Sequence, residues 1–202
     1  MKNLFNKPSL IGLIADINTG KSNLLYHIIE TLREDSDFNL FTFGLKFPQG
    51  HQVFSLEEME QIKDSIILID ETFNLFDLDN RSKKRQIENT LRLIHHNNNV
   101  IILSMLPENG KKFLSAKINT FIFKKCAISD CINGSRIKKI IGSYCGPEKG
   151  HAVLDIPIDQ ALTFDGKSFN MLDVKYYKEF DSKKGNKPIL VNKNAHSIRR
   201  VQ

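Results

Sequence analysis

Apolar residues along the first 125 positions fall into two kinds of pattern. Short continuous runs predict five strands, at residues 10–15, 38–45, 66–69, 100–103 and 120–123. Apolar residues repeated every three or four positions predict a helix after the first strand and another over 80–96. Shorter helices are expected at 55–62, where Ser55 and Glu58 form a capping box, and at 112–118. Apolar strands that alternate with helices are typical of an α/β fold with a mainly parallel sheet covered on both faces.

The pattern changes beyond residue 125. Short runs at 137–144, 152–156 and 169–177 are separated by Gly, Pro and Asp turns, which favours strands and hairpins. After Phe180 the chain is polar and basic and has little to bury. We therefore expect a core at residues 1–125, a small β-rich C-terminal extension of the same domain at 126–180, and a basic flexible tail at 181–202.

The net charge of this 202-residue chain is +6, and its pI is about 9.2. Many of the basic residues lie between positions 136 and 200. Such a surface attracts polyanions, of which nucleic acid is the commonest, although a solvated basic tail would have the same composition.

Cysteine usage and hydropathy indicate the compartment. Three cysteines are too few for a disulfide framework, and no apolar run is long enough for a membrane span or a secretory signal. Cys126, Cys131, Cys145 and His151 lack the C-x-x-C spacing of a zinc site, so reduced thiols are favoured over a metal. We expect a cytoplasmic protein without a membrane span.

Residues 15–22, with the sequence ADINTGKS, match the phosphate-loop pattern GxxxxGK[ST] except that Ala15 replaces the first glycine. In this motif backbone N–H groups surround the β-phosphate, Lys21 reaches the β and γ oxygens, and Ser22 binds Mg²⁺. The carboxylate of Asp16 would repel phosphates unless it points outward. The sequence therefore predicts an ATP and Mg²⁺ site, with these residues in contact with the nucleotide: Ala15, Asp16, Ile17, Asn18, Thr19, Gly20, Lys21, Ser22 and Asn23.

A second motif follows the strand at residues 66–69, which ends in Asp70 and Glu71. This is the Walker B pattern, in which Asp70 helps to hold Mg²⁺ and Glu71 accepts a proton from the attacking water. Alone, the pattern also fits a buried strand whose acids enter solvent. Together with the phosphate loop it predicts NTP hydrolysis, with Lys21 and Glu71 as catalytic residues.

The order of strands places these motifs in a class. One strand lies between them in sequence and another, VIILS, follows, which suits the ASCE class of P-loop ATPases and a RecA-like three-layer sandwich. Ser104, at the end of that next strand, is placed to contact the γ-phosphate or the water. A serine that merely ends a strand is an equal alternative.

The succession of ADINTGKS, IILIDE, TLRLIHHNNN and VIILSMLP resembles the FtsK/HerA superfamily, and within it the small genome-packaging ATPases of tailless and podovirus-like viruses. The resemblance covers residues 8–125, and Ser104 with Met105 stands where the family has a glutamine or asparagine. It implies a homo-oligomeric ring that moves double-stranded DNA into a capsid, with a capsid or portal-vertex protein as a partner. The protein would then lie in the host cytoplasm or in the virion.

The resemblance also implies an arginine that completes the site of the neighbouring subunit. This residue would be Arg92, with Arg81 and Arg85 as rivals, although an arginine on a helix is more often a surface ion-pair partner. Positive groups facing a pore would bind the DNA backbone without reading bases. The candidates, each of which could equally lie in a solvated loop, are Lys83, Lys84, Arg85, Lys111 and Lys112.

Two other functions remain open at this level. A nucleoside or nucleotide kinase shares the phosphate loop and the small size, but Asp70 and Glu71 suit activation of water better than a phosphoryl acceptor. A nucleotide-dependent switch or assembly protein without rapid turnover would fit a site weakened by Ala15 and Asp16.

Overall fold

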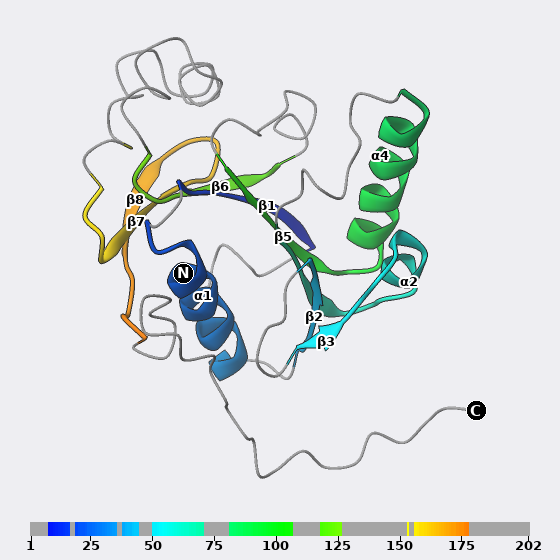
Figure 1. The fold of residues 1–202 in the computed structure, drawn as a ribbon, viewed down its shortest axis with the longest axis horizontal. Coiled ribbons are helices and arrows are strands. Elements are labelled where there is room, and N and C mark those ends of the chain that lie inside the picture. Colours follow the sequence, from blue (N-terminus) through cyan, green and yellow to red (C-terminus); the bar gives the residue numbers. More distant parts are fainter. Residues whose placement is uncertain are drawn as a thin grey trace.

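The computed structural model of the chain describes residues 8–16, 19–35, 38–44, 50–70, 81–106, 118–126, 153 and 156–177. In this part the chain forms one eight-stranded sheet and three helices (Figure 1). The strands are β1 (Ser9–Ile14), β2 (Asn39–Phe43), β3 (His51–Gln52), β4 (Ser65–Ile69), β5 (Val100–Met105), β6 (Thr120–Phe123), β7 (Gln160–Phe164) and β8 (Phe169–Asp173). The helices are α1 (Lys21–Asp35), α2 (Leu56–Glu60) and α4 (Arg81–His96).

The sheet has the order β3-β2-β4-β5-β1-β6-β7-β8. Neighbouring strands from β3 to β6 are parallel, and β7 and β8 continue the sheet as an antiparallel hairpin. Strand β5 lies between β1 and β4, which is the ASCE order that the sequence predicts. Because parallel strands end at the same edge, the last residues of β1, β4 and β5 lie at the carboxyl edge of the sheet.

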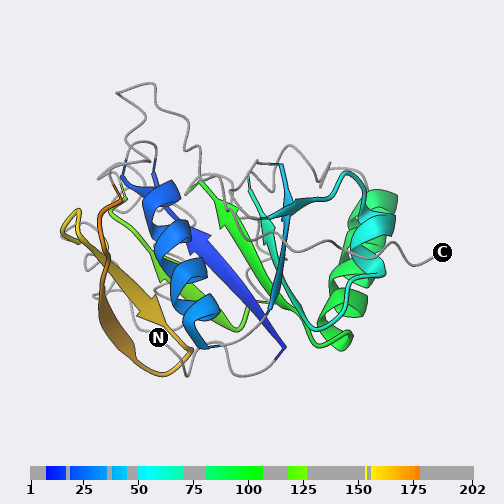
Figure 2. The ribbon, with the colours of Figure 1, turned by 90° about the horizontal axis from the view of Figure 1, so that it is seen from below.

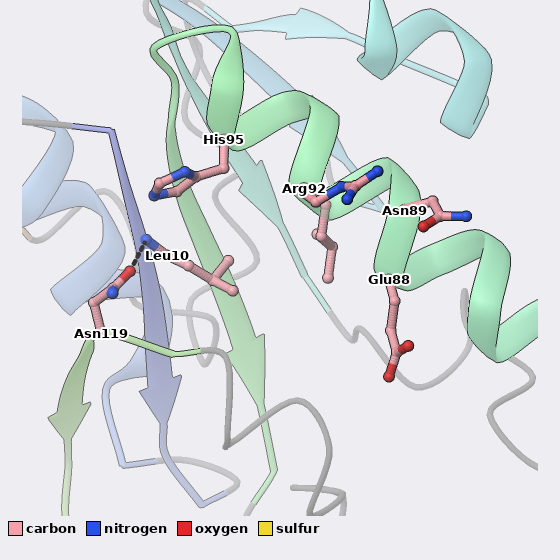
Figure 3. Close-up of a pocket in the computed structure, with 7 residues that line it drawn as sticks. Leu10, Glu88, Asn89, Arg92, His95 and Asn119 are labelled. Carbon is pink, nitrogen blue, oxygen red and sulfur yellow. Dashed lines mark hydrogen bonds between the residues drawn. The ribbon is translucent and has the colours of Figure 1, made fainter.

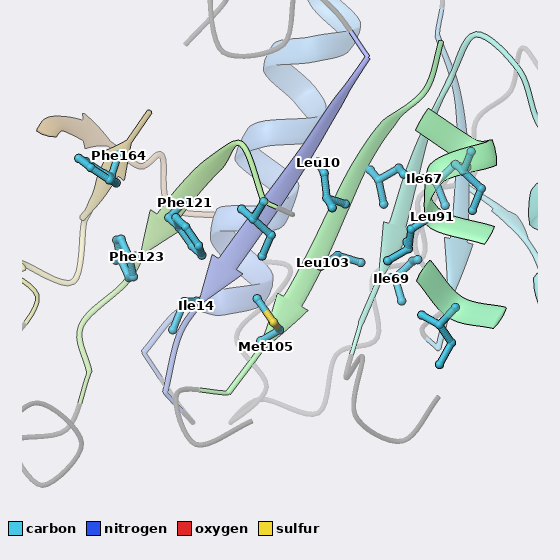
Figure 4. Close-up of a cluster of buried hydrophobic side chains, with 14 of the residues drawn as sticks. Leu10, Ile14, Ile67, Ile69, Leu91, Leu103, Met105, Phe121, Phe123 and Phe164 are labelled. Atoms are coloured by element: carbon cyan, nitrogen blue, oxygen red, sulfur yellow. The ribbon is translucent and has the colours of Figure 1, made fainter. Parts of the chain in front are cut away.

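Side chains of successive strand residues point to opposite faces and enter two separate cores. In β4, Ile67 and Ile69 pack with α2 and α4, whereas Ile66 and Leu68 pack with α1. Figure 2 shows α1 lying along one face of the sheet, and Figure 4 shows the core beneath α4. The result is the predicted three-layer α/β sandwich with the P-loop NTPase arrangement.

A buried asparagine closes the amino edge of the sheet. The Asn99 side chain accepts a hydrogen bond from the backbone N of Ser65 at 3.0 Å and donates to the carbonyl groups of Ile62 and Ile94. Its own carbonyl oxygen accepts from the backbone N of Ser9 at 3.2 Å. One residue thus joins the end of α4, the segment after α2, and the starts of β1 and β4.

The structure differs from the sequence-based expectation at several elements. Strands β3 and β7 were not predicted, because β3 pairs over only two residues and β7 directly follows a turn. The expected strand at 152–156 is wrong for the residues described, since Val153 and Ile156 are buried but lie outside any strand. The expected helix at 112–118 lies outside the described residues except for Ile118, which is not helical, and the expected element at 137–144 lies wholly outside them. Within the described part of the chain, no helix is long and apolar enough to cross a bilayer.

Candidate functional site

The phosphate-loop motif connects β1 to α1 at the carboxyl edge of the sheet. The backbone N of Ala15 donates to the carbonyl of Met105 at 3.2 Å, which joins the start of the loop to the end of β5. The hydroxyl group of Thr19 donates to the carbonyl of Asp16 at 2.8 Å and closes a turn. Gly20 has a φ of +87°, a conformation that glycine adopts at little cost, and its carbonyl accepts the first helical bond, from Leu24. The two predicted contact residues Ile17 and Asn18 lie outside the described residues.

Lys21 and Asp70 form an ion pair across the site. The Nζ atom of Lys21 donates to Oδ1 of Asp70 at 3.0 Å, and the two side chains are 17% and 19% exposed. The first residue of α1 thereby meets the residue that follows β4, 49 positions later in the sequence. The two motifs identified from the sequence converge in space.

The position of Asp70 depends on the neighbouring strand. Its backbone N donates to the carbonyl of Phe43 at 3.0 Å, which extends the pairing of β4 with β2. Gly44, with a φ of +82°, lies so close that an added Cβ would be 2.8 Å from the carbonyl oxygen of Asp70. Gly44 is a residue of the site that the sequence did not identify, because its contact partner lies on another strand.

The donor groups at this edge fit a magnesium nucleotide. A serine hydroxyl group and a carboxylate, from Ser22 and Asp70, are the hard oxygen ligands that Mg²⁺ prefers. The ion pair with Lys21 shows that the carboxylate of Asp70 already binds a positively charged group at this position. Glu71, the predicted proton acceptor, lies outside the described residues.

Two further predicted contact residues occupy defined positions. Ser104 is fully buried in β5 and pairs in register with Leu13 of β1, next to the phosphate loop. The side chain of Asn23 bonds the C-terminal segment: it donates to the carbonyl of Lys175 at 2.6 Å and accepts from the backbone N of Tyr177 at 2.7 Å. Contact of Ser104 and Asn23 with a nucleotide stays a prediction.

Arg92 lies on the exposed surface of α4, away from the phosphate loop of its own chain. It lines a groove of about 370 Å³ together with Leu10 and Asn119, which lie at the amino ends of β1 and β6 (Figure 3). The phosphate loop lies at the carboxyl edge, so Arg92 lies nearer the opposite edge of the sheet from the phosphate loop of its own chain. A role in a neighbouring subunit stays a prediction.

The predicted DNA contacts are only partly described. Lys83, Lys84 and Arg85 belong to the first turns of α4, and the side chain of Arg85 is exposed. Because α4 ends at the amino edge with His96, these residues lie about 17–20 Å along the helix toward the carboxyl edge. Lys111 and Lys112 lie outside the described residues.

A second lysine lies against the phosphate loop and was not singled out from the sequence. Lys124, directly after β6, is 1% exposed, and its Cε atom lies 3.5 Å from the position that a Cβ of residue 20 would occupy. The signal was present in the alternation of β6: two residues before Lys124, Ile122 faces the core beneath α1. A lysine in phase with a buried residue is placed toward the same core.

Comparisons with solved structures give the same arrangement of elements. The genome packaging NTPase B204 from Sulfolobus turreted icosahedral virus 2, in complex with AMPPCP, is similar with a TM-score of 0.65 and 13% sequence identity. The match covers 84% of this chain and 100% of that chain. No protein-family model matches the sequence, and no curated protein is significantly similar to it.

Two ATPases of other systems share the arrangement over part of their length. The pCW3 conjugation coupling protein TcpA has a TM-score of 0.61 at 15% identity, covering 89% of this chain and 63% of that one. ATPases 2 and 3 of EssC from Geobacillus thermodenitrificans have a TM-score of 0.57 at 11% identity, covering 88% and 42%. At these identities the likeness is one of fold.

Proposed function

We propose that this chain, which has the P-loop NTPase fold, is an ATP-hydrolysing DNA translocase that acts in viral genome packaging. The observation behind the proposal is the convergence of Lys21 and Asp70 at 3.0 Å on the carboxyl edge of a sheet in which β5 separates β1 from β4. The match to the whole length of a viral genome packaging NTPase supports the packaging role over other uses of the fold.

Hydrolysis would use groups that the fold brings together. Lys21 leaves the carboxylate of Asp70 and binds the β and γ phosphate oxygens, because a triphosphate offers it more negative charge. Ser22 and Asp70 would then hold Mg²⁺, which neutralises charge on the phosphates when bound. Glu71, the next residue after Asp70, orients the attacking water and accepts its proton.

Coupling to DNA would require more than one subunit. The basic residues at the start of α4, among them Arg85, supply phosphate contacts that are independent of base sequence. Lys111 and Lys112 are the second set. Arg92 would enter the site of the next subunit of a ring, and a capsid or portal-vertex protein would hold that ring at the particle.

The test is steady-state ATP hydrolysis by the purified protein, with and without double-stranded DNA. We expect DNA to stimulate turnover, and Lys21→Ala to abolish it by removing the charge that binds the phosphates. Lys125→Ala is the matched control, because Lys125 is an exposed lysine two residues after β6. Nucleotide binding without turnover under both conditions would contradict the motor.

A Glu71→Gln variant separates the motor from the two alternatives. The amide cannot accept a proton, so a motor should still bind ATP but lose turnover by 10²-fold or more, an order-of-magnitude figure for general-base removal. A switch without turnover would show no such loss. A kinase would transfer phosphate to a nucleoside or nucleotide acceptor and would not respond to DNA.

A further inference from the structure

Lys124 is the one fully buried charged side chain among the described residues. Its backbone N donates to the carbonyl of Ile14 at 2.9 Å, so its Cα atom lies beside the end of β1, where the phosphate loop begins. The side chain then extends on the α1 side of the sheet. Its position is fixed by sheet pairing and does not depend on a loop.

The ammonium group of Lys124 holds the entry to the C-terminal hairpin. Nζ donates to the carbonyl oxygen of Ile158 at 2.5 Å and to that of Gln160 at 2.8 Å. The exit of the hairpin is tied to the same segment, since the backbone N of Val174 donates to the carbonyl of Asp159 at 2.7 Å. Two of the three donors of the ammonium group are therefore used to fix this hairpin.

The same side chain lies beside the phosphate loop at Gly20. A Cβ atom built on Gly20 would lie 3.5 Å from Cε and 3.9 Å from Nζ of Lys124. Gly20 is the residue directly before Lys21, at the point where the backbone turns into α1. A buried positive charge thus lies directly behind the backbone that is predicted to surround the phosphates.

Burial lowers the pKa of the Lys124 ammonium group from 10.5 to about 8, and the carboxylate of Asp159 opposes part of this shift. The other titratable groups on the segments packed against it include Asp16 and Lys21 in the phosphate loop and Cys126 on its own segment. Cys126, on the same segment, donates from Sγ to the carbonyl of Lys124 at 3.3 Å, and in the phosphate loop Lys21 is paired with Asp70. Lys124 therefore changes charge within an accessible pH range.

We propose that Lys124 is a positioning residue of the phosphate loop, whose buried ammonium group fixes the loop at Gly20 against the C-terminal hairpin and strengthens binding of a nucleoside triphosphate. The inference rests on the proposed function, since it requires that the loop bind a nucleotide. Lys124 acts through the loop backbone and through its charge.

The charge gives this role a distinct pH dependence. At an effective dielectric constant near 20, a buried unit charge close to a phosphate-binding loop changes affinity for an anion by roughly tenfold or more. Below about pH 8 the ammonium group is charged and affinity is full. Affinity falls as the pH rises through 8 and levels off about one pH unit higher, because bound nucleotide raises the pKa of Lys124 in turn.

The experiment measures the dissociation constant of the magnesium complex of ATPγS from about pH 7 to about pH 9.5, where the terminal phosphate stays ionised. We expect affinity of the unaltered protein to fall roughly tenfold over this range. Lys124→Met should bind weakly at every pH, and Lys124→Arg should bind tightly at every pH because guanidinium stays charged. If Lys124 had only a structural role, Lys124→Met would lower the affinity for ATPγS but would not remove its fall with rising pH.

Asp159→Asn should move the pH at which affinity for ATPγS falls, and it leaves Lys124 itself unchanged. This variant keeps the test decisive if Lys124→Met does not fold. Loss of the carboxylate lowers the pKa of Lys124, so the step should move to lower pH. Cys126→Ser and the exposed Lys125→Met are the matched controls and should leave the profile unchanged. A step that Asp159→Asn does not move, or that Cys126→Ser abolishes, overturns the proposal.

Failure of the inference and failure of the proposed function give different results. If the unaltered protein binds ATPγS equally at every pH and Lys21→Ala abolishes binding, the nucleotide site stands and the role of Lys124 is wrong. If neither protein binds the nucleotide at any pH, the proposed function itself is wrong.

Discussion

The pair of Lys21 and Asp70 shows how single residues set the resting state of the site. Each side chain is mostly buried, so each would be costly to leave without an opposite charge. A magnesium nucleotide supplies a partner to both, a cation for the carboxylate and phosphates for the lysine. In the proposed function, the ion pair is therefore the arrangement before substrate binds, and substrate replaces it.

Gly44 offers a test of how closely Asp70 must be placed. We expect Gly44→Ala to lower the free energy of unfolding by about 1–3 kcal/mol, because φ is +82° and the new Cβ would lie 2.8 Å from the carbonyl oxygen of Asp70. Displacement of Asp70 should also weaken binding of Mg²⁺ and nucleotide. Denaturant unfolding and nucleotide titration measure the two effects.

Gly166 provides the matched control for Gly44. Its φ is +90°, but an added Cβ would meet nothing within 4 Å. Gly166→Ala should show the conformational penalty alone and leave nucleotide affinity unchanged. Equal nucleotide affinity in the two variants would mean that the close approach to Asp70 does not position it.

Residue patterns predicted that the two motifs carrying Lys21 and Asp70 belong together, and the structure brings these two side chains within 3.0 Å, but the patterns did not identify the residues around them. Lys21 and Asp70 were identified because each lies in a motif directly adjoining an apolar strand. Lys124 and Gly44 lie in no motif, and their contacts are made with residues brought near by sheet pairing. Such long-range neighbours are not encoded in local spacing.

At the scale of elements, continuous apolar runs predicted the central strands because β1, β4 and β5 are buried on both faces. The expected cap by Ser55 was also found, with the backbone N of Glu58 donating to Oγ of Ser55 at 3.1 Å, while the Glu58 carboxylate accepts from the backbone N of Phe54. Strand β3 has two exposed residues and no apolar pattern, so nothing in the sequence marks it.

The turn between α4 and β5 allows a test of how the amino edge of the sheet is stabilised. We expect Asn99→Ala to lower the free energy of unfolding by about 2–4 kcal/mol, because it leaves the backbone N of Ser65 and the carbonyl groups of Ile62 and Ile94 without their buried partner. Thermal or denaturant unfolding measures the change.

Asn98 is the matched control in the same turn. It has a φ of 61°, and its exposed side chain donates to Asp64. Asn98→Gly should change stability by less than about 0.5 kcal/mol, since glycine favours the left-handed conformation that ends a helix. A similar loss in both variants would show that the turn conformation, and not the buried amide of Asn99, holds the amino edge.

At the scale of the molecule, the proposed ring requires that Arg92 act in another subunit's site. We expect Arg92→Ala and Lys21→Ala to be inactive separately, and a mixture of the two to recover part of the ATPase activity. In mixed rings some interfaces combine an intact phosphate loop with an intact arginine. The measurement is turnover of the mixture against each variant alone.

Arg85→Ala tests the rival arginine on the same helix. If it complements Lys21→Ala and Arg92→Ala does not, the assignment moves to Arg85. Normal turnover by Arg92→Ala alone, or the absence of recovery in every mixture, would contradict a shared site built from α4.

The hydrogen bonds between Asn23 and the C-terminal segment also bear on how the protein folds during its synthesis on the ribosome. The side chain of Asn23 cannot bond the backbone of Tyr177 until that residue, 154 positions later in the sequence, has been synthesised. At a synthesis rate of 5–20 residues per second, the interval is roughly 8–30 s. Throughout that time the helix after the phosphate loop lacks the segment that secures its first turn. The candidate nucleotide site, although its motifs lie far upstream of Tyr177, therefore gains these contacts only late in synthesis.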